Sequence, residues 1–475
     1  MNLPRRNHAD SLWRADRRAL TIGLVLTITL VGFESLAIST VMPIVTRELG
    51  GLELYGWVFS AFFLGSLIGI VLVGGAIDRG GLAAPFALGL GLFAIGLLAG
   101  GLAPSMPVLV AARFVQGLGA GTIQPIAYVA IGRSLPDSLR PRMFATLSTA
   151  WILPGLIGPA IAGAVGESIG WRIVFLGLLP LIVVAGALTL GALRAVAVPP
   201  GVDEASAAAA SRARLPLAVT VAFGAGLLTV GLTSGQPVPT VALTAAGIVI
   251  GIYALRRLTP PGTLVARPVL PAAVLLRGVL TFAFFAIDAF VALTLVDWRG
   301  LSATTAGLAL TAATISWTAG SWTQARGAAR WPTHAFVRVG FGVVTLGLAG
   351  MLLVLVPEVP WTFAILTFGV AGFGMGLAYS PLALIVLRDA SPETHGVATS
   401  SLSLTDSLGT ALGTGLTGAM VAASVRATGN PEAGLAAGFA FAVVIGLVGL
   451  LLTARLRPRT APSTTLALSP ATPPS

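Results

Sequence analysis

The 475-residue sequence contains no cysteine and no lysine, and only 9% of its residues are charged. Without cysteine, the chain has no disulfide bond, no thiolate nucleophile and no cysteine-ligated metal. Its three histidines (His8, His334 and His395) lie apart in tails or loops, so we expect no metal site. Soluble domains carry about 25% charged residues, so a soluble domain is excluded.

Long apolar runs occupy most of the chain instead. Hydrophobic residues make up 56% of it, and the mean hydropathy is +0.93. A membrane-spanning helix needs about 20 mostly apolar residues. The sequence therefore predicts an all-α integral membrane protein with 14 transmembrane helices. The expected spans are 20–42, 54–76, 84–103, 107–131, 142–165, 172–193, 215–234, 238–255, 277–296, 301–324, 336–356, 361–387, 396–424 and 433–454.

The distribution of arginine supports this count. With the N-terminus in the cytoplasm, 23 of the 28 arginines face the cytoplasm, and Arg47, Arg172, Arg299 and Arg426 face outside. An excess of arginine on one side of the membrane indicates which side is cytoplasmic. We therefore expect both termini in the cytoplasm of a bacterial cell (plasma membrane), with the first span retained rather than cleaved as a signal peptide. The net charge of +11 reflects topology, so no nucleic acid partner is expected.

Two parts of the chain look like copies of each other. GLGAG at 117–121 matches GFGMG at 372–376 at an offset of 255 residues, and Glu34 and Asp288 are 254 apart. We expect two pseudo-symmetric six-helix bundles, at 20–193 and 277–454, with a connector at 194–276 that holds two extra central helices (215–234 and 238–255). A cytoplasmic segment (1–19) and a disordered tail (455–475) flank them. Parallel repeats of this kind are typical of carriers that work by alternating access.

Four charged residues fall inside apolar stretches: Glu34, Arg113, Asp288 and Asp406. A charge near the bilayer centre costs about 2.5–3.5 kcal/mol, so these residues are functional candidates. Burial disfavours the ionised form of a carboxyl group, so Glu34 and Asp288 can bind and release protons. Arg113 cannot discharge and needs an acid at similar depth. We expect all four to take part in proton coupling; static ion pairing or helix packing is the alternative.

Several polar and aromatic side chains are candidates for binding a substrate between the two bundles. An acid such as Asp288 could also neutralise a cationic substrate, and a tryptophan could stack on one. Lipid contact or core packing explains the aromatic residues equally well. The candidates are Asp288, Gln116, Gln124, Tyr128, Trp151, Trp317 and Tyr379.

Three motifs resemble the major facilitator superfamily, within it the fourteen-span drug:proton antiporters. They are GGAIDRGG (74–81), RFVQGLGAG (113–121) and PGLIGPAIAG (154–163). The resemblance implies that Gly74, Asp78 and Arg79 form a latch between the halves and that Gly158 and Pro159 belong to the antiporter motif, where they would bend the span. The third motif departs from the family pattern, since Pro154 and Ala162 stand at expected glycines.

The expected function is thus proton-coupled export of lipophilic, cationic or neutral small molecules such as drugs. The proton gradient supplies the energy, so no cofactor is expected, and the partners are a small-molecule substrate, protons and the lipid bilayer. We expect a monomer. Without a nucleophile–base pair in the apolar stretches, the chain is not expected to be an enzyme. The remaining alternatives are export of an endogenous lipid or secreted metabolite, and a non-transporting receptor or scaffold.

Overall fold

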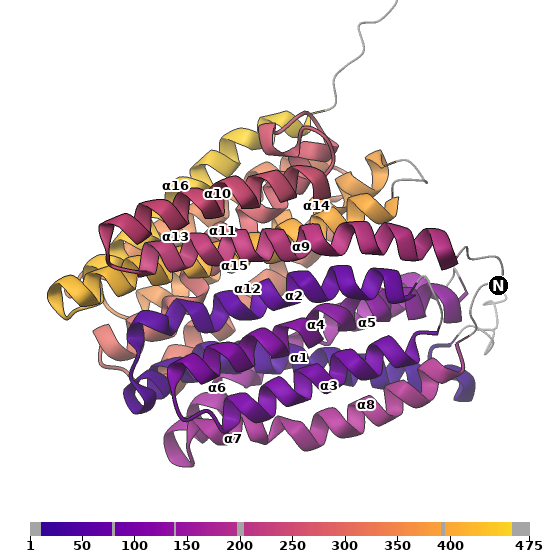
Figure 1. Ribbon diagram of the computed structural model, residues 1–475, viewed down its shortest axis with the longest axis horizontal. Helices are drawn as coiled ribbons and strands as arrows, with labels where there is room; N and C mark the ends of the chain where they lie inside the picture. Colours follow the sequence, from indigo (N-terminus) through magenta and orange to yellow (C-terminus); the bar gives the residue numbers. More distant parts are fainter. Residues whose placement is uncertain (1–10, 78–80, 137–138, 197–203, 391–394, 458–475) are drawn as a thin grey trace, which may run out of the picture.

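The computed structural model describes residues 11–77, 81–136, 139–196, 204–390 and 395–457, and within these ranges it is helical without any strand (Figure 1). The helices are α1 (Ala15–Leu49), α2 (Tyr55–Ile77), α3 (Ala83–Gly101), α4 (Met106–Ser134), α5 (Arg140–Thr149), α6 (Ile152–Ser168), α7 (Trp171–Leu176), α8 (Leu178–Arg194), α9 (Glu204–Thr233), α10 (Pro237–Leu258), α11 (Leu270–Leu293), α12 (Ala303–Gly327), α13 (Thr333–Val354), α14 (Phe363–Asp389), α15 (His395–Thr428) and α16 (Glu432–Leu452). Short turns of 3-10 or π helix are η1 (Leu52–Leu54), η2 (Thr263–Val265), η3 (Thr294–Trp298) and η4 (Thr453–Leu456).

A helix, or an interrupted pair of helices, occupies each of the fourteen predicted positions. Within the described residues, twelve helices are long and apolar enough to cross a membrane. The two positions that fall short are those of α6, which has only 17 residues, and α12, which is rich in Thr, Ser and Gly. We call the end of the bundle where α1 begins and α16 ends the terminal side, and the other end the opposite side.

The predicted single helix at 142–165 is wrong, because the chain is interrupted between α5 and α6 at Ala150 and Trp151. Pro154 has no N–H group and cannot bond to the carbonyl four residues earlier, which is that of Ala150. Pro154, which departs from the family motif, therefore lies in the first turn of α6, directly after the interruption. Pro159 lies inside α6 without ending it.

Two predicted connectors are shorter than expected. Helix α9 begins at Glu204, inside the connector placed at 194–214, and α11 begins at Leu270 rather than at 277. Pro271 stands in the first turn of α11, where a proline needs no hydrogen-bond partner and suits the start of a helix. This shift moves Arg277 from a helix end into the interior of α11.

Helices α9 and α10 pack against each other, and α9 also packs on α2 and α15. Because α2 and α15 contact each other across the two halves, α9 lies along one edge of the line where the halves meet (Figure 1). In the most apolar stretch of α10 only 11% of the residues are buried, against 83% for α11. The extra pair is therefore peripheral, and α11 is the central helix of the bundle.

The glycines of the two repeated motifs make equivalent contacts. Gly121 of α4 lies directly against the carbonyl oxygen of Ser66 in α2. Gly376 of α14, 255 residues later, lies in the same way against the carbonyl oxygen of Trp317 in α12. The central glycine of each motif faces the next helix, α3 in the first half and α13 in the second. Only glycine allows helices to approach so closely, so the repeat in the sequence is a repeat in packing.

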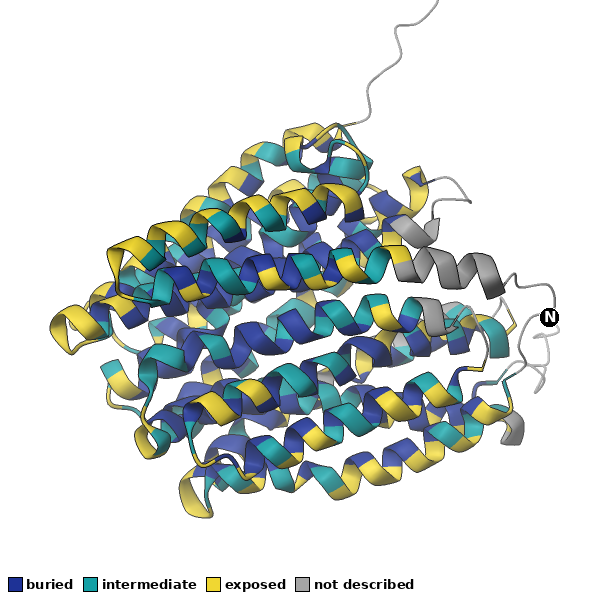
Figure 2. Cartoon of the chain, in the orientation of Figure 1, coloured by how far each residue is buried: buried dark blue, intermediate teal, exposed yellow. Residues whose placement is uncertain are grey.

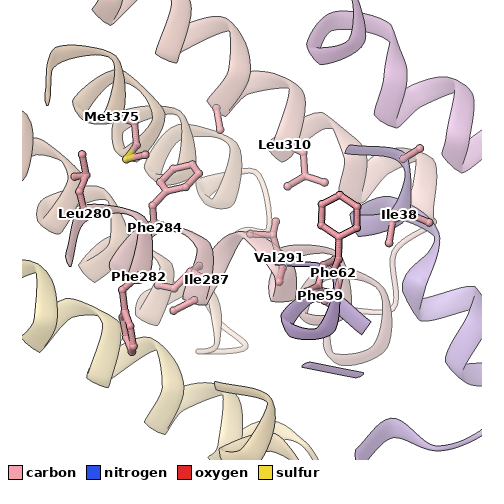
Figure 3. Packing of buried hydrophobic residues seen from close by; sticks show 14 of the residues in the cluster. Ile38, Phe59, Phe62, Leu280, Phe282, Phe284, Ile287, Val291, Leu310 and Met375 are labelled. Carbon is pink, nitrogen blue, oxygen red and sulfur yellow. The ribbon is translucent and has the colours of Figure 1, made fainter. Parts of the chain in front are cut away.

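The apolar core runs through both halves. One cluster of buried side chains includes Ile38 of α1, Phe62 of α2, Val291 of α11 and Leu310 of α12. Val291 and Leu310 lie beside Phe59 and Phe62 in Figure 3. Exposed residues gather instead on outer helices such as α3, α8 and α10 (Figure 2). The two halves thus share an apolar interface, while the outer helices present apolar side chains to the surroundings, as expected for a protein in lipid.

We predict that Gly121→Ala lowers the stability of the purified protein by about 1–3 kcal/mol, because the added methyl group overpacks the α2–α4 contact. Gly91→Ala in α3 is the matched control, since nothing lies within 4 Å of a methyl group added there. That change should leave stability unchanged or raise it by about 0.5–1 kcal/mol. Thermal unfolding in detergent measures both, and equal effects at the two positions would contradict the packing argument.

Candidate functional site

A buried ion pair joins α1 to α4 in the first half. Arg113 donates a hydrogen bond from Nη1 to the Glu34 carboxylate and another to Oε1 of Gln116 at 2.6 Å. All three side chains are buried. The sequence-based expectation that Arg113 finds an acid at its own depth is confirmed for Glu34, and Gln116 is the third member of the cluster.

The rest of the guanidinium is held by α2. Its Nε donates to the carbonyl oxygen of Val58 at 3.3 Å, and the group lies 4.3 Å from the centre of the Phe62 ring. The second carboxylate oxygen of Glu34, Oε2, is buried without a hydrogen-bond partner. Glu34 therefore has one oxygen fixed by Arg113 and one that is open to a proton.

A second ion pair lies in the other half and includes a residue that the sequence did not single out. Arg277 of α11 donates from Nε to Asp406 of α15 at 2.9 Å and from Nη1 to the carbonyl oxygen of Tyr379 in α14 at 2.6 Å. The Tyr379 hydroxyl donates to the other Asp406 oxygen at 3.1 Å, and the guanidinium stacks on the tyrosine ring. Three helices thus meet at one charge pair.

The sequence predicts Arg277 at the start of a span, among the cytoplasmic arginines, and that prediction is wrong, because its side chain is 8% exposed inside α11. An arginine that follows a proline-rich segment is typical of a helix boundary. The partners of the Asp406 carboxylate lie on other helices, since Arg277 of α11 and Tyr379 of α14 both donate to it. A signal for this pair existed in the sequence: one acid and one arginine, each inside an apolar stretch, have complementary charges.

Asp288 differs from both pairs. It is partly buried on α11 and forms no hydrogen bond or ion pair with any other described residue. At the 255-residue offset it lies one residue before the position that corresponds to Glu34, and the residue 255 positions after Arg113 is Phe368. The second half therefore carries the acid without the arginine that neutralises it in the first half.

Asp288 lies where the two halves meet. Phe285, one turn earlier on α11, has its ring 6.2 Å from that of Phe63 in α2. Tyr55, also in α2, donates a hydrogen bond at 3.1 Å to the carbonyl oxygen of Ala289, the next residue after Asp288. The uncompensated acid is thus flanked by contacts between the halves.

Aromatic rings connect this region to the second ion pair. Phe284 stacks on Phe368 at 5.2 Å and meets Trp317 edge-on at 5.7 Å. Trp317 in turn lies 5.3 Å from the ring of Tyr379, the partner of Asp406. Two predicted substrate-binding residues, Trp317 and Tyr379, therefore belong to one aromatic cluster, which contacts the second ion pair at one end and the segment next to Asp288 at the other.

The other predicted binding residues lie on α4 and at the start of α6. Gln124 donates to the Tyr128 hydroxyl at 2.7 Å, and both side chains are exposed. Trp151 is exposed and its ring lies over Gly32 of α1. These residues are not part of either ion pair.

The residues expected to gate the carrier are placed in part. Gly74 lies near the end of α2, while Asp78 and Arg79 lie outside the described residues. Pro159 of α6 packs directly on Gly307 of α12, and Gly158 faces the ring of Phe33 in α1. The antiporter-like motif therefore lies on the contact between α6 and α12, one of the contacts that join the halves.

The halves are tied together at the opposite side. Arg47, near the end of α1, bonds Asp297 at 2.7 Å. Glu167, near the end of α6, accepts from the backbone N–H of Ala303 at 2.5 Å and from the Thr304 hydroxyl at 2.8 Å. These ties join α1 to the end of α11 and α6 to the start of α12. Within the described residues, no three histidine or acidic side chains gather as a metal site would require.

A helical bundle of membrane-spanning length, built from two repeated halves with charge pairs buried inside, defines a membrane transporter. The model of the Major Facilitator Superfamily matches residues 24–414. The chain belongs to this superfamily, which confirms the resemblance of its motifs.

Among curated proteins, MdtP, a multidrug transporter protein of Bacillus subtilis, is 26% identical over 83% of this chain and 74% of its own length. The methylenomycin A resistance protein of Streptomyces coelicolor is 26% identical over 82% of both chains. A probable multidrug-efflux transporter of Mycobacterium tuberculosis is 35% identical, but the match spans only 30% of each chain.

Solved structures share the fold at low sequence identity. A D-xylose–proton symporter is similar with a TM-score of 0.65 at 14% identity, over 93% of this chain and 98% of its own. An inward-facing bacterial homologue of the human lysosomal transporter Spinster is similar with a TM-score of 0.63 at 16% identity, over the same shares. Both likenesses extend over nearly the whole described bundle.

We predict that Asp406→Asn destabilises the protein by about 3 kcal/mol, because it leaves the Arg277 guanidinium buried without a counter-charge. Replacing both residues by leucine should recover most of the loss, since a buried pair can give way to apolar packing. Asp389→Asn, which breaks a surface pair with Arg388, is the control and should cost under about 1 kcal/mol. Thermal unfolding measures the stability of each variant. An Asp406→Asn protein as stable as the Asp389→Asn control would contradict a stabilising role of the Arg277–Asp406 pair.

Proposed function

We propose that this chain is a proton-coupled antiporter of fourteen spans that exports lipophilic, cationic or neutral compounds across a bacterial plasma membrane by alternating access. The observation that carries the proposal is Asp288, the one acid of the three inside the bundle that has no cation partner among the described residues. Curated relatives that cover four fifths of the chain are a multidrug transporter and an antibiotic resistance protein. Their names support export of foreign compounds.

The charge balance explains why a lone acid favours exchange. Glu34 is neutralised by Arg113, and Asp406 by Arg277. An ionised Asp288 would add an uncompensated negative charge, which costs about 2.5–3.5 kcal/mol in the membrane interior. It therefore binds either a proton or a positively charged ligand, and each excludes the other. Competition of two cations for one carboxylate is the minimal requirement for antiport.

The aromatic cluster supports the class of ligand. Phe284 and Phe285 lie on the same helix as Asp288, and Trp317 contacts Phe284 edge-on. Aromatic faces attract organic cations and also bind flat neutral compounds. We infer that the acid supplies the charge preference while the rings supply the apolar surface.

Glu34 provides a second proton-binding group. Its free Oε2 can accept a proton, and protonation would remove the charge that holds Arg113. Because α1 and α4 are joined by this pair, loss of the charge would loosen the first half. The ties at the opposite side, such as Arg47–Asp297, must also open for the halves to alternate. A proton moving down 100 mV supplies about 2.3 kcal/mol, enough for a gradient of roughly 50-fold.

We predict that tetraphenylphosphonium, a lipophilic cation, displaces a proton from the detergent-purified protein and that Asp288→Asn abolishes the release. The asparagine cannot exchange a proton, so the pH change of a weakly buffered solution should vanish. Asp389→Asn at the end of α14 is the matched control and should behave as the native protein does. Proton release of native size from Asp288→Asn would remove this residue from the exchange.

We also predict that Glu34→Gln abolishes export driven by an imposed pH gradient in proteoliposomes while cation binding persists. The glutamine preserves the size of the side chain and a hydrogen bond to Arg113 but not the titratable charge. Transport of a compound library under the same gradient tests the function as a whole. Export of neither cations nor neutral drugs by the native protein would contradict drug export and favour an endogenous lipid or metabolite.

A further inference from the structure

Two adjoining cavities lie on the terminal side of the second half, where α12 turns into α13 beside the end of α14. One has a volume of about 230 Å³ and is lined by His334, Arg388 and Trp331. The other has a volume of about 390 Å³ and is lined by Arg326, Arg330 and again Trp331. The larger volume falls within the range of ordinary ligand sites, roughly 300–1,000 Å³. Trp331 is the wall that the two cavities share.

The larger cavity has basic side chains at its rim. Arg326, in the last turn of α12, and Arg330, in the following turn, are both exposed. Neither forms an ion pair with a described acid, and Arg326 only stacks on Trp322 at 5.4 Å. The backbone N–H groups of Arg330 and Trp331 both donate to the carbonyl oxygen of Gly327, which holds the turn. Two unneutralised guanidinium groups are therefore presented from a fixed turn.

The inner part of the same cavity is apolar. Phe336 packs over Gly327 and its ring lies 6.1 Å from that of Trp331. Val339, Phe373 and Leu377 continue the lining along α13 and α14. The cavity therefore combines a cationic rim with an apolar interior, and a ligand that fits it is an amphiphile with an anionic end.

The depth of the cavity indicates the kind of amphiphile. Trp322 is 58% and Trp331 56% exposed, near the ends of spans, and tryptophan prefers the boundary between acyl chains and head groups. Arg326 lies one turn after Trp322 and Arg330 directly precedes Trp331, so both arginines are close to these boundary tryptophans. Basic pockets between helices on the cytoplasmic side bind anionic head groups.

We propose that this cavity binds one anionic phospholipid, with its phosphate between Arg326 and Arg330 and an acyl chain along Val339, Phe373 and Leu377. The site lies apart from both ion pairs and from Asp288, so it is independent of the transport mechanism proposed above. Lipid bound there bridges α12, α13 and α14, the helices that carry Trp317 and Tyr379.

The chain offers a matched control at the end of α10. Arg256 and Arg257 are exposed on the same side of the bundle, and Arg257 lies 5.3 Å from the ring of Tyr253. This group repeats the composition of two arginines and an aromatic ring, but lines neither of the two cavities. A purely electrostatic attraction of lipid would treat the two sets alike, whereas a built site would not.

The test uses the full-length protein in detergent, titrated with phosphatidylglycerol or phosphatidylcholine and analysed by native mass spectrometry. We expect one phosphatidylglycerol to bind more tightly than the rest. The double variant Arg326→Gln with Arg330→Gln should bind it about 30-fold more weakly, the equivalent of ~2 kcal/mol for two arginines. Arg256→Gln with Arg257→Gln should bind it as the native protein does.

Three results would overturn the proposal: equal losses in the two double variants, no loss in either, or a preference for phosphatidylcholine. Inorganic phosphate is added in a separate titration to distinguish a lipid from a free anion. Displacement of phosphatidylglycerol by phosphate at similar concentration would identify an anion site and contradict the lipid. A third variant, Val339→Phe, fills the apolar part of the cavity and should weaken the binding of phosphatidylglycerol without changing any charge.

Discussion

The cost of placing a charge in the membrane interior is the constraint on which the structure depends. Breaking a buried ion pair costs about 3–5 kcal/mol, so a buried arginine holds its acid in place. Arg113 holds α1 against α4 through Glu34 and also reaches a carbonyl of α2. Arg277 holds α11, α14 and α15 together through Asp406 and Tyr379. Among the described residues, each half is therefore fastened by one charge pair inside the bundle.

The contact between the two halves consists mainly of apolar packing. Apolar side chains such as Val291 and Phe62 share one cluster, and glycines let α2 approach α15 and α6 approach α12. Polar contacts between the halves include the exposed pair Arg47–Asp297 at the opposite side and the buried hydrogen bond from Tyr55 to the carbonyl oxygen of Ala289. Exposed pairs are worth about 0–1 kcal/mol. An interface of small-residue packing and few polar contacts suits the alternating access proposed above.

Much of this could be predicted from the sequence, because apolar length, arginine bias and the repeat are local or periodic signals. The positions of the helices followed from them, and for Arg113 they left two candidate acids, Glu34 and Asp288, of which the structure shows Glu34 as the partner. The pair of Arg277 with Asp406 could not be predicted in the same way. An arginine after several prolines is typical of the end of a helix, and Asp406 is 129 residues away. The break before Pro154 has a local cause, the missing N–H group of the proline, whereas the close contact between α6 and α12 depends on how the halves pack, which a single sequence does not display.

The repeat is most informative where it fails. Glu34 and Asp288 lie within one residue of equivalent places, yet Phe368 stands where the second half would need the counterpart of Arg113. Phe368 stacks on Phe284, so the exchange of an arginine for a phenylalanine removes a fixed cation and adds an aromatic face at once. Arg277 does not restore the balance, because Asp406 already neutralises it. In the exchange proposed above, the acid without a cation partner is therefore the one that binds a mobile positive charge, whereas Glu34 in the first half is already paired with Arg113.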